Sequence, residues 1–284
     1  MVKEMIDGTY RQTNLANESA EYLAKREEVR LAEIELMRAR ERVAELRRAL
    51  PKGAEIQDYG FFECTLPDGR VSAQSHAIPD GRATAPITDA LPDGRATVQG
   101  PAALTGGDEP VIKVRLSELF TSADRSLVIY HFMFGKKQTT ACPMCTAWID
   151  GYNGVAHHIA QTTDFAIVAA ADPATLRAYA RERGWNKLRL LSAGDSTFKY
   201  DLGSEDKEGN QDSTISVFTK ESDGTLRHFY SGHPWLDPEI KERGIDELSP
   251  IWNILDLTPQ GREKFYTSLD YGLNIKKGVQ IART

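Results

Sequence analysis

"SLVIYHFMFGKKQTTACPMCTAW", residues 126–148, joins an almost continuous apolar run to a closely spaced pair of cysteines. Residues 126–134 are typical of a strand that is buried on both faces of a sheet. A short loop follows, and a helix is predicted from about Cys142 to Ile159. The C-x-x-C pair therefore opens a helix directly after a buried strand, and this context matters more than the cysteine spacing alone.

The position of Cys142 favours an ionised thiol. Pro143 suits the first helical turn, where its missing N–H leaves no hydrogen bond unmade. Cys142 would face free backbone N–H groups at the positive end of the helix dipole, where thiol pKa values fall from about 8.5 to roughly 3.5–7.5. Cys145 lies three residues on, on the same helical face and within disulfide reach. We predict that Cys142 attacks a substrate and that Cys145 resolves the mixed disulfide.

Two other interpretations of the pair stay open. A C-x-x-C is also half of many zinc sites, which need two more ligands. His157 and His158 are adjacent on the predicted helix and point about 100 degrees apart, so we expect no metal site. Alternatively, the cysteines are two small apolar residues that pack the start of the helix.

The pattern after residue 111 alternates strands with helices. Strands are predicted at 111–116, 126–134 and 164–171, a helix begins at Pro173 and ends at Gly184, and an antiparallel hairpin is formed by 214–220 and 225–231. Two further helices are expected around 246–254 and 258–266. This order indicates an α/β fold with a central mixed sheet, parallel at first and ending in a hairpin, flanked by helices.

Residues 17–50 are predicted to form one long helix that starts at Asn17 or Ser19 and stops before Pro51. Its apolar residues follow a heptad seam, which favours a single partner helix and a homodimer, although a helix along its own domain carries a similar stripe. The seam residues are Leu15, Tyr22, Val29, Ala32, Leu36, Ala39, Val43, Leu46 and Leu50.

Residues 59–65 are typical of a strand, and a threefold repeat follows it. "LPDGR", "IPDGRAT" and "LPDGRAT" begin at positions 66, 78 and 91, and Pro-Asp-Gly favours turns. We therefore divide the chain into a long helix with possible dimerisation (1–58), a strand with a turn-rich PDGR insertion (59–110), the α/β domain (111–270) and a C-terminal tail (271–284).

Composition excludes several function classes. The net charge of −6 gives no electrostatic footprint for nucleic acid. No apolar run approaches the roughly 18 to 20 residues that cross a membrane. The first residues, "MVKEMIDGTYRQ", lack an apolar core behind a basic region, so we expect no signal peptide. Only three cysteines are present, and together these features favour a reducing cytoplasm.

The element order resembles the thioredoxin-like fold, with a long N-terminal helix and a β/turn-rich insertion added to it. More closely, "VIYHFMFG", "CPMCTAWIDGYNG", "RERGW", "FKYD" and "LDLTPQGR" resemble a bacterial thioredoxin-like family of uncharacterised function. The resemblance covers about residues 15–65 and 111–266, and the PDGR repeats look like an insertion. It implies a C-x-x-C oxidoreductase in which Pro143 and Met144, between the two cysteines, contact the substrate.

The chain departs from the thioredoxin pattern at two positions. Ser213 or Thr214 stands where thioredoxins place a proline that lines the substrate groove, and we take Thr214 as a substrate-binding residue. Ala141 stands where a tryptophan usually precedes the first cysteine. The loop also resembles the P-x-x-x-T-x-x-C motif of peroxiredoxins: Thr139 matches the threonine, whereas Gly135 replaces the proline.

We therefore predict a thiol–disulfide oxidoreductase with Cys142, Cys145 and Thr139 at its site. The alternatives are a peroxiredoxin-like peroxide reductase, with Thr139 donating a hydrogen bond to the peroxide, and a redox-inactive interaction module. We expect no cofactor, and as partners either a disulfide-bearing protein or a small thiol or peroxide.

Overall fold

A computed structural model describes residues 5–6, 9–10, 15–64, 111–240, 243–262 and 265–269. The three PDGR repeats and the tail at 271–284 lie outside the described residues. Contacts divide the chain into two compact units, Met1–Pro51 and Lys52–Thr284. The second unit thus begins before the boundary that we placed at residue 58.

The first unit contains a hairpin of β1 (Met5–Ile6) and β2 (Thr9–Tyr10) and the predicted long helix, α1 (Ala20–Arg48). Ser19 caps α1, since its hydroxyl accepts the Tyr22 N–H at 3.1 Å. No residue of α1 is buried, and its apolar seam is exposed to solvent.

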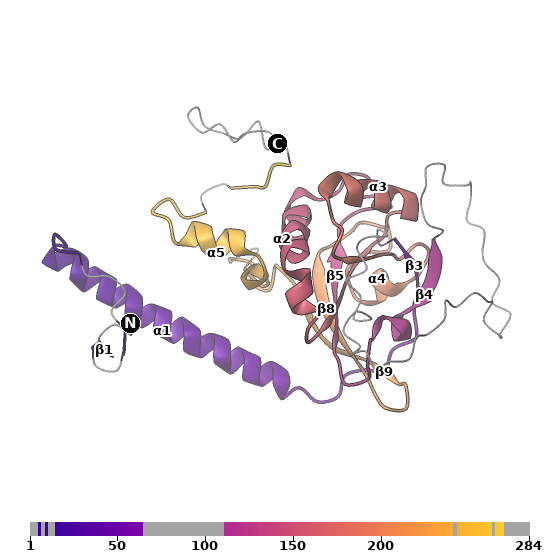
Figure 1. The fold of residues 1–284 in the computed structure, drawn as a ribbon, viewed down its shortest axis with the longest axis horizontal. Helices are drawn as coiled ribbons and strands as arrows, with labels where there is room; N and C mark the ends of the chain where they lie inside the picture. Colours follow the sequence, from indigo (N-terminus) through magenta and orange to yellow (C-terminus); the bar gives the residue numbers. More distant parts are fainter. Residues whose placement is uncertain are drawn as a thin grey trace, which may run out of the picture. The chain divides into compact units, whose positions relative to one another are not determined.

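The second unit is built on one seven-stranded sheet in the order β4-β3-β7-β6-β5-β8-β9 (Figure 1). β5, β6 and β7 are parallel neighbours, whereas β8 runs antiparallel to β5 and pairs with β9. The strands are β3 (Gly60–Glu63), β4 (Ile112–Arg115), β5 (Leu127–Phe132), β6 (Asp164–Ala169), β7 (Arg189–Ser192), β8 (Thr214–Lys220) and β9 (Leu226–Gly232).

This arrangement is the predicted thioredoxin-like fold. The strand before the cysteines lies between its parallel successor and the antiparallel hairpin, as expected from right-handed strand–helix–strand connections. The sheet also contains a strand that was not predicted, β7, in which Leu190 and Leu191 are the only apolar residues and show no alternation. It joins the predicted strand β3 to the central sheet.

Helices cover both faces of the sheet (Figure 1). α2 and α3 pack with Tyr130 and Phe132 on one face, and α4 packs through Phe198 with Ile129 on the other. The helices of the second unit are η3 (Leu116–Leu119, 3₁₀), α2 (Pro143–Ile159), α3 (Pro173–Arg183), α4 (Phe198–Asp201), η4 (Asp246–Leu248, 3₁₀) and α5 (Pro250–Asp256).

The ends of α3 agree with the sequence prediction. Asp172 accepts the Thr175 N–H at 3.0 Å, and Pro173 occupies the first helical position. Gly184 ends the helix with a φ of 68°, a left-handed conformation that glycine adopts without strain.

The C-terminal helices differ from the prediction. The helix expected at 246–254 is split into η4 and α5 at Pro250. The helix expected at 258–266 is absent from residues 258–262 and 265–266, the part of it that is described. The chain turns back instead, because Arg262 bonds Asp246 and Asp256 and stacks on Trp252 at 4.6 Å.

None of the helices in the described residues combines the length and apolarity that crossing a membrane requires.

Candidate functional site

Cys142 is the N-cap of α2. Its sulfur accepts the backbone N–H of Cys145 at 3.3 Å, and Pro143 occupies the first helical position as predicted. The Cys142 carbonyl accepts both the N–H and the hydroxyl of Thr146, at 3.0 and 2.9 Å. The first turn of α2 contains no acidic residue. Nothing in that turn therefore opposes the positive end of the helix dipole beside the thiol.

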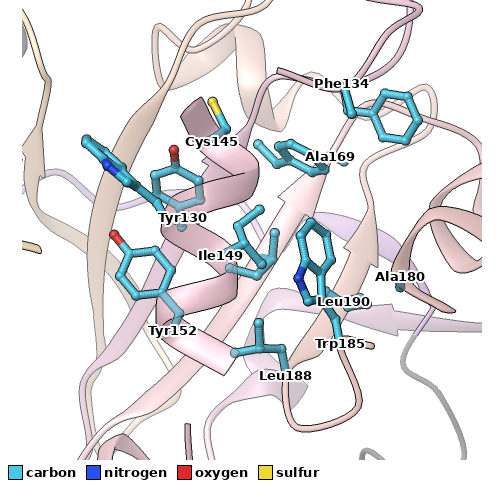
Figure 2. Packing of buried hydrophobic residues seen from close by; sticks show 14 of the residues in the cluster. Tyr130, Phe134, Cys145, Ile149, Tyr152, Ala169, Ala180, Trp185, Leu188 and Leu190 are labelled. Carbon is cyan, nitrogen blue, oxygen red and sulfur yellow. The ribbon is translucent and has the colours of Figure 1, made fainter. Parts of the chain in front are cut away.

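Both cysteines are buried, with 8% of Cys142 and 3% of Cys145 exposed. Their surroundings are nevertheless polar. The donors to the Cys145 sulfur are the Cys142 thiol, the backbone of Met133 and the Tyr130 hydroxyl, which shares a hydrogen bond of 2.9 Å with the Ser213 hydroxyl beside it. Figure 2 shows the Tyr130 hydroxyl close to Cys145 at the start of α2. The site is thus an enclosed dithiol with several hydrogen-bond donors directed at the inner sulfur.

These donors decide which sulfur is ionised. Burial raises the pKa of Cys145, but the hydrogen bonds from Cys142, Tyr130, Met133 and Ser213 outweigh it and lower this pKa to about 7. The pKa of Cys142 is raised, first by its hydrogen bond to Cys145 and then by burial. The sequence led us to expect the lowered pKa at Cys142. The structure places it at Cys145 because three of the donors come from β5 and β8 or the residues beside them, which helix geometry alone does not reveal.

Tyr130 is held rigidly as a donor. It is fully buried in β5, and its hydroxyl lies 2.9 Å from that of Ser213. The rings of Trp148 and Tyr152 lie 5.7 and 5.5 Å from its own. Burial raises the pKa of Tyr130 well above its ordinary value, so the hydroxyl keeps its proton.

The structure brings some of the predicted site residues together and separates others. Pro143 and Met144 are half-buried beside the cysteines, whereas Thr139 is exposed in the loop before α2. Thr214 shares a face of β8 with Ser216, which bonds His131 on the face away from α2. Of the two residues at the position of the thioredoxin proline, Ser213 therefore contacts the sulfur. Substrate contacts of Pro143, Met144 and Thr214 stay predictions.

The third cysteine has a different environment. Cys64 is fully buried, and its thiol donates to the Phe62 carbonyl at 3.3 Å. Burial raises the pKa of Cys64 to about 12, so its thiol stays protonated at neutral pH. Across the part of the chain that the structure describes, no three His, Cys, Asp or Glu side chains cluster closely enough to hold a metal ion.

Sequence reasoning missed Tyr130, Met133 and Lys199. Tyr130 has a usable signal: strand alternation places Tyr130 and Phe132 on the face opposite His131, and an aromatic hydroxyl precedes the cysteines. Met133 contributes a backbone N–H, which has no sequence signature. Lys199 is a buried lysine whose Nζ donates to the Phe132 carbonyl, next to Met133, at 3.2 Å; it comes from α4, whose four residues are too few for a recognisable pattern.

Fold and site together define a thioredoxin-fold protein with a buried dithiol at a helix N-terminus. The chain belongs to the family described as "Bacterial protein of unknown function (DUF899)", which matches residues 106–276. This agrees with the resemblance to a bacterial family of uncharacterised function.

Among curated proteins, none matches the chain. Solved structures of peroxiredoxins are similar to it at low identity. Mycobacterium tuberculosis AhpC is 11% identical with a TM-score of 0.39, over 70% of this chain and 89% of its own. Peroxidoxin BcpB from Mycobacterium tuberculosis is 13% identical with a TM-score of 0.37, over 70% of this chain and 94% of its own. A cysteine-to-serine mutant of Xanthomonas campestris peroxiredoxin Q is 14% identical with a TM-score of 0.32, over 38% of this chain and 68% of its own.

Proposed function

We propose that this protein is a thiol–disulfide oxidoreductase that uses the Cys142–Cys145 pair. One observation carries the proposal: the two thiols lie at the start of α2, where the Cys142 sulfur accepts the Cys145 N–H at 3.3 Å and hydrogen bonds to the Cys145 sulfur lower its pKa to about 7. Such an arrangement stabilises one negative charge on the pair near neutral pH, and only a thiolate attacks a disulfide.

Cys142 is the attacking residue in this proposal, because it lies at the tip of α2 and is the more exposed of the two. Its proton passes along the shared hydrogen bond to the Cys145 sulfur as Cys142 attacks one sulfur of the substrate disulfide. The substrate S–S bond breaks, a Cys142–substrate disulfide forms, and the other substrate sulfur leaves as a thiolate that takes a proton from water.

Cys145 then loses its proton and attacks the Cys142 sulfur. The mixed disulfide breaks, the Cys142–Cys145 disulfide forms, and the second substrate thiolate leaves and is protonated. Two electrons have moved from the dithiol to the substrate, together with the single thiol proton of the reduced pair, and water has supplied the second proton. An external dithiol reductant restores the pair by the same exchange in reverse.

The test uses Cys142→Ser, Cys145→Ser and, as a matched control, Cys64→Ser. We expect reduction of a small aromatic disulfide by the native protein with a dithiol reductant and no turnover by either site variant. Cys145→Ser should accumulate the mixed disulfide in mass spectra, whereas Cys64→Ser should behave as the native protein does.

Two outcomes would support the alternatives instead. Peroxide consumption that is lost only in Cys142→Ser supports a peroxide reductase, in which Cys142 is oxidised to a sulfenic acid while the peroxide O–O bond breaks. If the pKa of Cys145 measured by alkylation is near or above about 8.5, and no disulfide forms under mild oxidant, an interaction module without redox chemistry is supported.

We also propose that α1 pairs with the α1 of a second copy of this chain. Its seam residues are exposed, among them Tyr22 (53%), Val29 (55%) and Leu36 (50%), and they repeat every seven residues. A narrow a/d seam of this kind fits one partner helix with the same seam.

A further inference from the structure

Lys199 is a buried amine close to the dithiol. It lies in α4 with no exposed surface, and its Nζ donates to the Phe132 carbonyl at 3.2 Å. Among the described residues, no carboxylate lies within ion-pair distance of this ammonium group. Buried lysines normally have a partner charge, because removing an ammonium group from water is costly.

The carbonyl that Lys199 contacts belongs to a peptide group that also contacts the site. Phe132 C=O and Met133 N–H are the two ends of one planar, resonance-stabilised unit. The Met133 N–H is the backbone donor to the Cys145 sulfur. A positive charge at the oxygen end draws electron density from the N–H, which strengthens its hydrogen bond to a thiolate. One peptide group therefore links the buried ammonium to the inner sulfur.

Capping this carbonyl does not require Lys199. The Phe132 oxygen already accepts the Phe134 N–H at 3.0 Å. An apolar side chain would therefore leave no unpaired acceptor. Pairing the Phe132 oxygen therefore does not explain why Lys199 is buried here. The group that its charge can influence through this peptide is Cys145.

We propose that Lys199 is a positioning residue of the dithiol, which acts through the Phe132–Met133 peptide group to keep the negative charge of the reduced pair on Cys145. The inference rests on the proposed function. It assigns Lys199 a role in setting which sulfur is ionised, and hence which sulfur accepts the proton when Cys142 attacks.

The charges around both groups agree with this coupling. Burial lowers the pKa of Lys199 to about 7, and the negative charge of Cys145 is the largest influence that opposes it. Glu205 and Asp212 also favour the charged amine, and Lys136 disfavours it. The other ionisable groups that interact with Lys199 or with Cys145 are Lys136, Glu205, Asp212, His131, Tyr130, Tyr152 and Cys142.

The test compares Lys199→Met, Lys199→Arg and Lys220→Met in the full chain. Lys220 is the matched control, because its Nζ also donates to a backbone carbonyl, that of Ser117 at 3.1 Å, and not to the peptide beside Cys145. The readout is the pH titration of the Cys145 Cβ chemical shift in reduced protein with isotope-labelled cysteine.

We expect Lys199→Met to raise the pKa of Cys145 by about one unit or more, the size expected when an opposite charge is lost nearby. Lys199→Arg should keep the native value, and so should Lys220→Met. Should Lys199→Met not fold, as judged by circular dichroism, Lys199→Gln replaces it with the same expectation.

An unchanged Cys145 pKa in folded Lys199→Met overturns the inference, and so does an equal rise in Lys220→Met. This readout needs no turnover, so it separates the inference from the proposed function. An unmoved pKa with intact disulfide reduction refutes the inference alone. A raised pKa in a protein that reduces no disulfide refutes the function alone.

Discussion

The hydroxyls of Tyr130 and Ser213 share a hydrogen bond of 2.9 Å beside Cys145, and hydrogen bonding from this pair lowers the pKa of the Cys145 thiol. Tyr130 belongs to β5, and Ser213 directly precedes β8, the antiparallel neighbour of β5. The Cys145 thiolate is thus stabilised from outside its own helix, by two strands that are far apart in the sequence.

Tyr130→Phe tests this stabilisation, because it removes one hydroxyl and leaves the ring in place. We expect the pKa of Cys145 to rise by about 0.7, since a lost hydrogen bond is worth about 1 kcal/mol. Disulfide formation under mild oxidant should slow accordingly at neutral pH. Tyr59→Phe is the matched control, because that hydroxyl bonds Asp201 at 2.8 Å and not a cysteine. Equal pKa values of Cys145 in the two variants would contradict the assignment.

The stability of the reduced protein should depend on the ionisation of Cys145. Its folded pKa of about 7 lies below the unfolded value of about 8.5, so its contribution is full above the unfolded pKa and is lost as pH falls through 7. Relative to Cys145→Ser, the native protein should gain about 1.3 kcal/mol of unfolding free energy between about pH 7 and about pH 8.5. Urea unfolding of both proteins with reductant present measures the difference, and a constant difference across this range would refute the prediction.

We expect Lys199→Met to stabilise the folded protein, although it raises the pKa of Cys145. The folded pKa of Lys199 is about 7 and the unfolded value is about 10.4, so the burial penalty is full below pH 7 and vanishes above the unfolded pKa. Removing the charge should raise the unfolding free energy by about 4 kcal/mol near neutral pH, with little change at alkaline pH. Denaturant titrations at the two pH values provide the measurement, and Lys220→Met should show no such gain. A loss of stability in Lys199→Met would indicate that the ammonium group is mainly structural.

Leu36 and Leu31 test the pairing of α1. Both are 50% exposed, but Leu36 lies on the heptad seam and Leu31 lies off it. We expect Leu36→Lys, or deletion of the helix, to give a monomer, because a buried ammonium group is unfavourable in an apolar seam. Leu31→Lys should keep the native assembly. Light scattering gives the mass of each variant, and the same mass for Leu36→Lys and the native chain would exclude this interface.

Most of the fold could be read from local patterns. The apolar run of β5, the caps of α1 and α3 and the hairpin of β8 and β9 were predicted within a few residues, because alternation and capping are properties of neighbouring residues. β7 was missed because its two apolar residues are adjacent and show no alternation, and α4 was missed because four residues make only about one helical turn. The helix expected at 258–266 was wrong in its described part, because the ion pairs of Arg262 with Asp246 and Asp256 turn the chain back.

The site, too, was determined partly by local sequence and partly by tertiary structure. Its placement at the start of α2 was already contained in the order of residues, because a strand, a short loop and Cys-Pro-x-Cys force two thiols onto one helix tip. The order of residues did not show which sulfur is ionised, because the groups that favour Cys145 are Tyr130, Met133 and Ser213. Their convergence depends on how β5 and β8 pair, and electrostatic stabilisation acts through distances in space, whatever the separation along the chain.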